Sequence, residues 1–145
     1  MPRLQCILLV EDNEDDAELT TRAFAQAKIA NPLVRVSDGV EALDYLFSRG
    51  SFADRDPILP AVVLLDLKLP RLDGLDVLKA IRAAPQTRYL PVVMLTSSDH
   101  DRDRIAAYHN QVNSYVKKPV DYDQFVDAAR QLGLYWAVIN LPVGP

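Results

Sequence analysis

Short apolar runs recur along this chain, and polar residues follow each of them. The runs at residues 7–10, 62–65 and 92–95 are continuously apolar, and a shorter one ends at Val116. Strands that are buried on both faces of a parallel sheet have this pattern. Between the runs, apolar residues recur at the three- and four-residue spacing of amphipathic helices. The pattern therefore predicts alternating strands and helices, which is typical of an α/β fold with a parallel sheet.

Proline, glycine, asparagine and aspartate mark the expected ends of these elements. The expected strands span residues 4–10, 33–36, 61–65, 91–95 and 114–116. The expected helices run from 15 to 28, from 40 to 47 with an end at Gly50, from Asp73-Gly74 through Ile81, from 101 to 108, and from a cap at Asp121 through Leu132. Residues 51–60 are polar and proline-bearing, and we expect a loop there. Right-handed crossovers would place helices on both faces of the sheet.

Composition favours one soluble domain over residues 1–145. This length is sufficient for a single core, and 49% hydrophobic and 25% charged residues are ordinary values for a globular protein. The net charge of −4 gives no sign of nucleic-acid binding. Cys6, the single cysteine, excludes an internal disulfide framework. The sequence shows no signal peptide and no apolar span of membrane length, so we expect a cytoplasmic protein without membrane association.

Chemically useful residues follow the predicted strands. Glu11-Asp12 comes after the first predicted strand, Asp66 after the third, Thr96 after the fourth and Lys118 shortly after the fifth. The carboxyl ends of parallel strands form the usual ligand site of such sheets. Clustered carboxylates repel one another unless a cation such as Mg²⁺ neutralises them. An aspartate can attack phosphorus, while a lysine and a metal balance the phosphoryl charge. The strand ends thus predict a site for a divalent cation and a phosphoryl group.

Each of these residues also has a structural interpretation. Glu11 and Asp12 suit the start of a helix, where acids are stabilised. Thr96 suits an N-cap, Asp66 an ordinary strand end, and Lys118 a solvated surface. Taken singly, these interpretations are at least as good as the functional ones. Taken together they are weaker, because four strand ends carry complementary parts of one phosphoryl site.

The order of the motifs resembles a known family. The motifs are Glu11-Asp12-Asn13, Asp66 with Lys68 and Pro70, Asp73-Gly74, Thr96-Ser97, and Lys117-Lys118-Pro119. Over nearly the whole chain they resemble the receiver domain of two-component response regulators. The resemblance implies a flavodoxin-like, doubly wound sheet of five parallel strands in the order 2-1-3-4-5, with five helices. It implies a protein that accepts a phosphoryl group from a histidine kinase, not an enzyme acting on other substrates.

The resemblance also assigns roles to residues. Asp66 would be the phosphoacceptor, and Lys118 would bind the phosphoryl group. The Mg²⁺ ligands would be Asp12, Asp66 and the backbone carbonyl of Lys68, with Glu11 acting mostly through water. Thr96 and Tyr115 would form the conformational switch. The kinase would contact the exposed start of the first helix and the turn after Lys118, at Asp15, Asp16, Thr20, Pro119, Val120 and Tyr122.

Two features narrow the resemblance. The long segment 48–60 and the apolar extension at residues 133–145 resemble single-domain regulators that partner phytochrome-type histidine kinases. A single-domain receiver of a chemotaxis system or a phosphorelay is the alternative. We expect no output domain. The extension predicts a symmetric homodimer with Tyr135, Trp136 and Ile139 at its interface, unless it folds back on its own domain.

Two other classes of protein fit less well. Phosphatases of the haloacid dehalogenase type carry a second acid two residues after the nucleophile, and this chain has Lys68 there. A flavodoxin-like cofactor binder needs a phosphate-cradling loop after the first strand. The acidic residues at 11–12 and 14–16 would instead repel a phosphate that lacks a metal.

Overall fold

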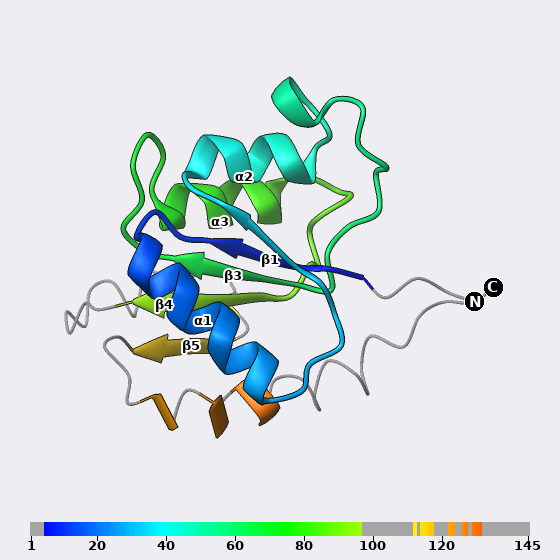
Figure 1. Ribbon diagram of the computed structural model, residues 1–145. Helices are drawn as coiled ribbons and strands as arrows, with labels where there is room; N and C mark the ends of the chain where they lie inside the picture. Colours follow the sequence, from blue (N-terminus) through cyan, green and yellow to red (C-terminus); the bar gives the residue numbers. More distant parts are fainter. Residues whose placement is uncertain are drawn as a thin grey trace.

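The protein folds into a parallel sheet covered on both faces. The computed structural model describes residues 5–96, 112, 114–117, 122–123, 126–127 and 129–131. Among these residues, five parallel strands form one sheet in the order β2-β1-β3-β4-β5, as the sequence predicts (Figure 1). The elements are β1 Ile7–Val10, α1 Glu14–Gln26, β2 Leu33–Val36, α2 Gly39–Leu46, a 3₁₀ turn Gly50–Phe52, β3 Val62–Asp66, α3 Gly74–Ala83, β4 Val92–Thr96 and β5 Ser114–Lys117.

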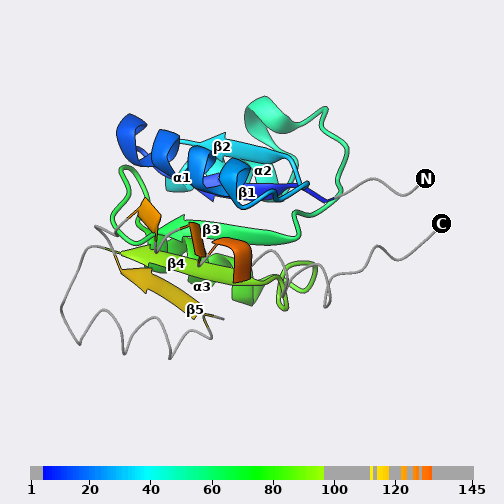
Figure 2. The same ribbon diagram turned by 60° about the horizontal axis from the view of Figure 1, so that its bottom comes forward.

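The side chains of the strands alternate between two apolar layers. Leu8, Val63 and Met94 pack with the buried faces of α2 and α3. Ile7, Leu64 and their neighbours pack with α1 and with Val126 and Ala129 on the other face. Figures 1 and 2 show α1 on one face of the sheet and α2 with α3 on the other. Burial on both faces explains why β1 and the cores of β3 and β4 are continuously apolar.

The helices α1, α2 and α3 each begin with a side-chain cap at the carboxyl-end edge of the sheet. The caps are Asn13, Asp38 and Asp73, and their oxygens accept hydrogen bonds from the backbone N–H of Asp16, Glu41 and Asp76 at 2.9, 2.8 and 3.0 Å. Such caps satisfy backbone donors that have no partner within the helix. They therefore fix where each connection turns from strand to helix.

The first strand is shorter than predicted. It begins at Ile7, although the apolar pattern predicts a start at residue 4. Its neighbour β2 is preceded by Pro32, which has no N–H to continue the ladder. The side-chain amide of Asn31 donates to the Gln5 carbonyl at 2.7 Å instead. Pairing as a strand therefore starts only where Ile7 donates to the Pro32 carbonyl, at 2.8 Å.

Helix α2 ends earlier than predicted, and Gly50 is not its terminator. The helix stops at Leu46, and Ser48 adopts the left-handed conformation with φ +51°. A left-handed residue just past the last turn commonly ends a helix. Here serine takes the position for which the sequence pattern suggested glycine. Gly50, with φ +59°, instead starts the 3₁₀ turn within the segment expected to be a plain loop.

Arg55 organises the long connection between α2 and β3. Its guanidinium lies 3.8 Å from the centre of the Tyr45 ring and donates to the Tyr45 carbonyl at 2.7 and 3.0 Å. It also donates to the carbonyls of Asp56 and Ile58. The Tyr45 ring meets Phe52 edge-on, with centroids 5.2 Å apart, and its hydroxyl lies 3.3 Å from the Cys6 thiol. The connection is thus a structured part of the fold.

The remaining boundaries differ by one or two residues at most. Helix α1 begins at Glu14 and ends at Gln26, and β3 extends to Asp66 itself. Residues 122–123, 126–127 and 129–131 are helical, where the last helix is predicted. The predicted helix at 101–108, the cap at Asp121 and the extension 133–145 lie outside the described residues. No helix among the described residues has the length and apolar character needed to cross a membrane.

Candidate functional site

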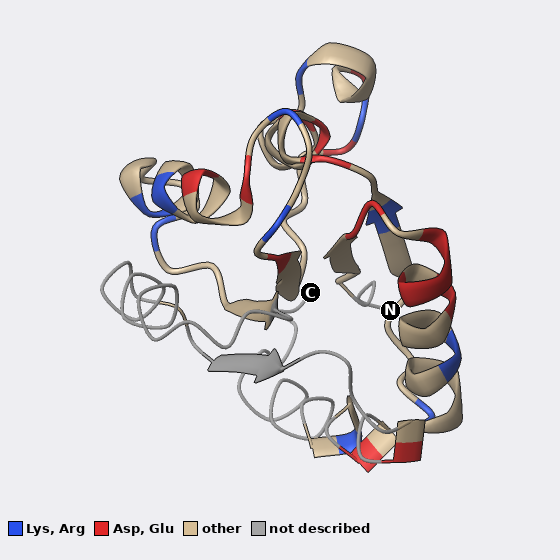
Figure 3. Cartoon of the chain, turned by 90° about the vertical axis from the view of Figure 1, so that its left-hand side faces the viewer, with Lys and Arg blue, Asp and Glu red and all other residues tan. Residues whose placement is uncertain are grey.

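Three carboxylates meet at the carboxyl ends of β1 and β3. Glu11, Asp12 and Asp66 each offer one oxygen, and these oxygens all lie within 4.8 Å of one another. The two strands are paired in parallel, with Val10 opposite Leu65. Glu11 follows Val10 and Asp66 follows Leu65, so these two acids lie side by side. Figure 3 looks onto this edge and shows acidic residues along the β1–α1 connection and at the end of β3. The sequence predicts this cluster correctly.

The three acids differ in exposure. Glu11 is fully buried, Asp66 is half-buried and Asp12 is exposed. Glu11 is held from β2 at both backbone groups: its N–H donates to the Val36 carbonyl at 3.0 Å, and its carbonyl accepts from Arg35 Nε at 3.0 Å. Arg35 also pairs with Glu14 at 3.2 Å. The backbone of Glu11 is therefore fixed by β2, while Asp12 is exposed to solvent.

The donor set of this cluster suits a hard divalent cation. Mg²⁺ and Mn²⁺ favour carboxylate, carbonyl and water oxygens, and Mg²⁺ usually keeps several waters. The cluster offers three carboxylate oxygens, and its exposed member, Asp12, is open to water. Three adjacent negative charges also gain from a cation that neutralises them. The residues present therefore fit a divalent metal.

The connection from β3 to α3 starts at the acid cluster. The backbone N–H of Lys68 lies 3.4 Å from Asp66 Oδ1. Leu67 donates its N–H to the Leu95 carbonyl and accepts from the N–H of Gly74, both at 2.9 Å. These bonds anchor both ends of the loop that carries the Lys68 carbonyl. That carbonyl is the backbone ligand that the sequence predicts.

A pocket opens beside the acids. It has a volume of about 490 Å³. Its lining comes mainly from the loop after β3 and comprises Asp12, Leu67, Lys68, Leu69, Pro70, Asp73 and Leu75. This volume is ample for a phosphoryl group and the end of a side chain that delivers it. The exposed Asp12 is the one member of the acid cluster among the residues that line this pocket.

The other predicted strand ends are placed by the backbone register. Thr96 ends β4 and pairs with Lys117 of β5, while Tyr115 pairs with Met94. Thr96 therefore ends the strand next to Asp66, because Asp66 pairs with Leu95. Lys118 immediately follows the last residue of β5. Lys118, Pro119 and Val120 lie outside the described residues.

The predicted kinase contacts are only partly exposed. Asp15 is exposed and Asp16 half-buried at the start of α1, as expected for a surface site. Thr20 is fully buried, so its expected exposure is wrong. It lies one turn deeper on the side of α1 that faces the sheet, and its hydroxyl donates to the Asp16 carbonyl at 2.9 Å. Tyr122 is half-buried and donates to Gln26 Oε1 at 2.8 Å. The predicted dimer residues Tyr135, Trp136 and Ile139 lie outside the described residues.

Some residues that shape the site are missed by sequence reasoning. Arg35 holds the Glu11 backbone from an adjacent strand, and Arg71 pairs with Asp38 beside the β3–α3 loop. Neither arginine belongs to a recognisable motif. The N-cap of α1, Asn13, could have been predicted, because an asparagine followed by several acids is typical of a helix start.

Comparisons with known proteins identify the family of this chain. The sequence matches the response regulator receiver domain family over residues 7–130. This chain belongs to that family and is a receiver domain of a two-component response regulator.

Similar proteins come from several signalling contexts. The probable methanogenesis regulatory protein FilR2 of Methanothrix harundinacea is 41% identical over 140 residues, covering 96% of this chain and 88% of that one. Response regulator Rcp1 of Synechocystis is 33% identical, covering 94% and 92%. A crystal structure of its Mn²⁺-bound form superposes with a TM-score of 0.81 and covers 91% and 94%. The bacteriophytochrome response regulator RtBRR is 50% identical, with a TM-score of 0.81 and coverage of 96% and 84%.

Proposed function

We propose that Asp66 accepts a phosphoryl group from a histidine kinase and that the modified domain signals through altered protein contacts. The observation that carries this proposal is the meeting of Asp66 with Glu11 and Asp12 within 4.8 Å at the carboxyl ends of adjacent strands. Membership of the receiver family supports the same conclusion. The protein is a phosphoacceptor that undergoes chemistry on its own side chain, not an enzyme that turns over another substrate.

In the proposed reaction, a carboxylate oxygen of Asp66 attacks the phosphorus of a phosphohistidine. The new O–P bond forms as the P–N bond breaks, and the electron pair returns to the imidazole nitrogen. The product is an acyl phosphate on Asp66, and water later hydrolyses it.

We assign the metal site to Asp12, Asp66 and the Lys68 carbonyl, with Glu11 contributing mainly through water. Bound Mg²⁺ would offset the negative charge shared by the carboxylates and the incoming phosphoryl oxygens. The carboxylate oxygens of Glu11, Asp12 and Asp66 support this assignment, and the Mn²⁺-bound structure of Rcp1 is a precedent among similar proteins. Of the three acids, Glu11 is the one fixed by hydrogen bonds from β2.

We assign the switch to Thr96 and Tyr115, with Lys118 as the cation that binds the phosphoryl group. The end of β4 lies beside Asp66 in the sheet, which supports a role for Thr96 in sensing the new phosphoryl oxygens. A local charge change of this kind can bias a two-state element. Thr96→Ala should still accept phosphate but show a smaller change in partner binding. Identical phosphorylation-dependent binding in wild type and variant would contradict the switch.

We infer that the kinase is of the phytochrome type and that both proteins act in the cytoplasm. The support is the similarity to the bacteriophytochrome regulator RtBRR and to Rcp1. A chemotaxis or phosphorelay kinase is the alternative partner. Initial rates of transfer from autophosphorylated kinases of each type would decide between them. A phytochrome-type kinase should be fastest, and a faster chemotaxis kinase would contradict this inference.

We further propose that residues 1–145 act as a single receiver domain that forms a symmetric homodimer through Tyr135, Trp136 and Ile139. The concentration of apolar residues in 133–145 supports this interface. Removal of residues 136–145 should give a monomer that still labels at Asp66. A full-length protein that sediments as a monomer at high concentration, with and without phosphorylation, would contradict the dimer.

A further inference from the structure

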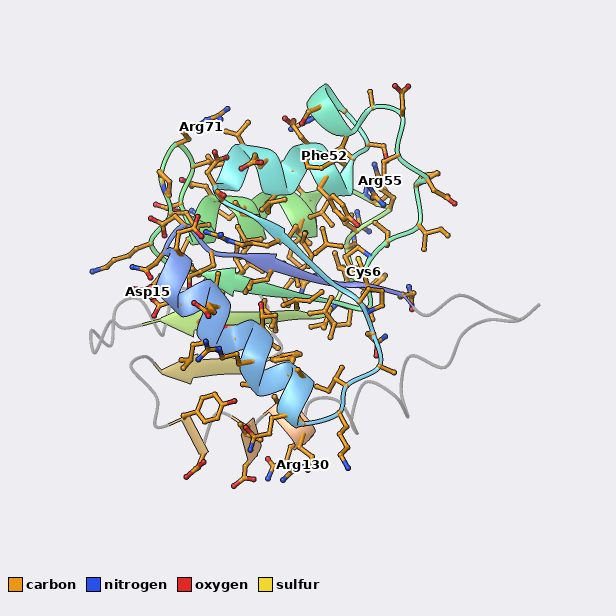
Figure 4. All side chains as sticks on the ribbon, viewed as in Figure 1. Cys6, Asp15, Phe52, Arg55, Arg71 and Arg130 are labelled. Carbon is orange, nitrogen blue, oxygen red and sulfur yellow. The ribbon has the colours of Figure 1, made fainter. Side chains whose placement is uncertain are left out.

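The loop that follows Asp66 is tied to the start of α2 by an ion pair. Arg71 Nη1 lies 3.2 Å from Asp38 Oδ2. Asp38 is buried, and its other carboxylate oxygen caps α2 by accepting from the Glu41 N–H at 2.8 Å. Figure 4 shows Arg71 on the loop beside the start of α2, at the same edge of the sheet as Asp15. One carboxylate therefore serves both the helix cap and the loop.

A backbone contact reinforces this tie. A Cβ on Gly39, the first residue of α2, would stand 2.8 Å from the carbonyl carbon of Leu72, closer than real Cβ contacts occur. The loop backbone consequently lies directly on the first turn of α2. Only glycine permits so close an approach without moving the loop.

The backbone of Arg71 is in an unfavourable conformation. Its φ of +67° lies in the left-handed region, which residues other than glycine rarely adopt. Such a conformation persists when the surrounding structure fixes it. The Asp38 carboxylate is the partner that holds the Arg71 side chain, and the Leu72 N–H donates to the Pro70 carbonyl at 2.7 Å within the same turn.

We propose that Arg71 and Asp38 are positioning residues for the metal site. Resting on the proposed function, the inference is that this pair holds the β3–α3 loop so that the Lys68 carbonyl faces the cation. Lys68 lies between Asp66 and Arg71 on that loop and lines the same pocket as Asp12. The Arg71 side chain is 60% exposed, so the pair adds little to global stability, and its role is geometric.

Removal of the Arg71 side chain should change the affinity for Mg²⁺ in opposite directions according to whether charge or loop geometry dominates. Arg71 is a cation close to a proposed cation site, and its loss would unmask the Asp38 carboxylate. By Coulomb's law alone, both changes strengthen Mg²⁺ binding. A loosened loop instead weakens binding, because the carbonyl ligand is no longer held in place. The sign of the change therefore separates the two explanations.

The test is calorimetric titration of Mg²⁺ into wild type, Arg71→Ala and Arg71→Gly. The glycine variant relieves the left-handed strain, so it remains informative if the alanine variant folds poorly. Both variants should bind Mg²⁺ about tenfold more weakly, at the low end of what loss of a supporting group around a metal site costs. Labelling by acetyl phosphate should slow at low Mg²⁺ and return to within about twofold of wild type at saturating Mg²⁺, since the reacting groups are intact. Arg49→Ala is the matched control, because Arg49 pairs with Asp44 at the other end of α2 at 3.0 Å.

A double-mutant cycle identifies the pair. Asp38→Asn keeps an oxygen for the helix cap but loses the negative charge. The change in Mg²⁺ affinity that it causes should be smaller in the Arg71→Ala background than in wild type. Unchanged or tighter Mg²⁺ binding by Arg71→Ala, or a loss of equal size in Arg49→Ala, would overturn the proposal. Failure of the proposed function has a different signature, because Asp66→Asn would then label like wild type whatever the Arg71 variants do.

Discussion

Gly74 lies against the backbone of Leu67, so that a Cβ on Gly74 would stand 2.8 Å from Leu67 Cα. The N–H of Gly74 also donates to the Leu67 carbonyl at 2.9 Å. The start of α3 and the residue after Asp66 are therefore in direct backbone contact. This contact closes the loop that carries Lys68.

The first prediction follows from that contact. Gly74→Ala should force the start of α3 away from β3 and reduce the free energy of unfolding by roughly 2–4 kcal/mol. Denaturation by urea measures the loss. Asp76→Ala, in the same first turn, should cost less than about 1 kcal/mol, because it removes only a favourable charge at the helix start. Equal losses in the two variants would show that the close contact is relaxed at little cost.

The second prediction concerns the acid cluster. Asp12→Asn should weaken Mg²⁺ binding roughly tenfold or more, a loss of at least about 1.4 kcal/mol. Without metal, the same variant should be more stable than wild type, because one of three neighbouring negative charges is removed. Thermal melts with and without Mg²⁺ measure both effects. Asp15→Asn, exposed but outside the cluster, is the control, and a matching loss of Mg²⁺ affinity there would contradict the assignment.

The third prediction concerns recognition of the kinase. Asp15→Lys should slow phosphoryl transfer from the kinase while leaving labelling by acetyl phosphate unchanged, because Asp15 is exposed at the start of α1 and outside the acid cluster. Asp54→Lys makes the same charge change at an exposed site on the α2–β3 connection and should leave both rates unchanged. If Asp15→Lys slowed both reactions equally, the residue would serve the site and not the interface.

The fourth prediction is a dependence of stability on alkaline pH. Burial, and then the hydrogen bond with Cys6, raise the pKa of Tyr45 from 10.0 to about 12. The folded protein thus favours the neutral phenol, so the stabilisation is complete below pH 10 and is lost as pH rises toward 12. The stability advantage of wild type over Tyr45→Phe should shrink across that interval. A constant difference between their urea midpoints would contradict the raised pKa.

Much of this architecture follows from the sequence because its determinants are local. Three continuously apolar runs, and acids placed directly after two of them, are sufficient to predict the parallel sheet and the meeting of Glu11, Asp12 and Asp66. The end of α2 was less predictable, since Ser48 adopts a conformation that glycine usually supplies. The contacts of Arg35, Arg55 and Arg71 depend on residues distant in sequence, and an isolated arginine carries no pattern that names its partner.

The buried state of Thr20 shows a different limit of sequence reasoning. Its position near the start of α1 suggested exposure together with Asp15 and Asp16. In an amphipathic helix, however, Thr20 lies on the same side as Ala17 and Phe24, which pack on the sheet. Its hydroxyl is satisfied by the Asp16 carbonyl, so a polar residue is accommodated in the buried layer.

Labelling of the whole protein by acetyl phosphate with Mg²⁺ tests whether Asp66 is the phosphoacceptor. Intact mass spectrometry should show a single base-labile phosphoryl group on wild type, no labelling without a divalent cation, and none on Asp66→Asn. Asp15→Asn should label like wild type, because its carboxylate lies outside the acid cluster. Labelling of Asp66→Asn at the wild-type level would contradict the account.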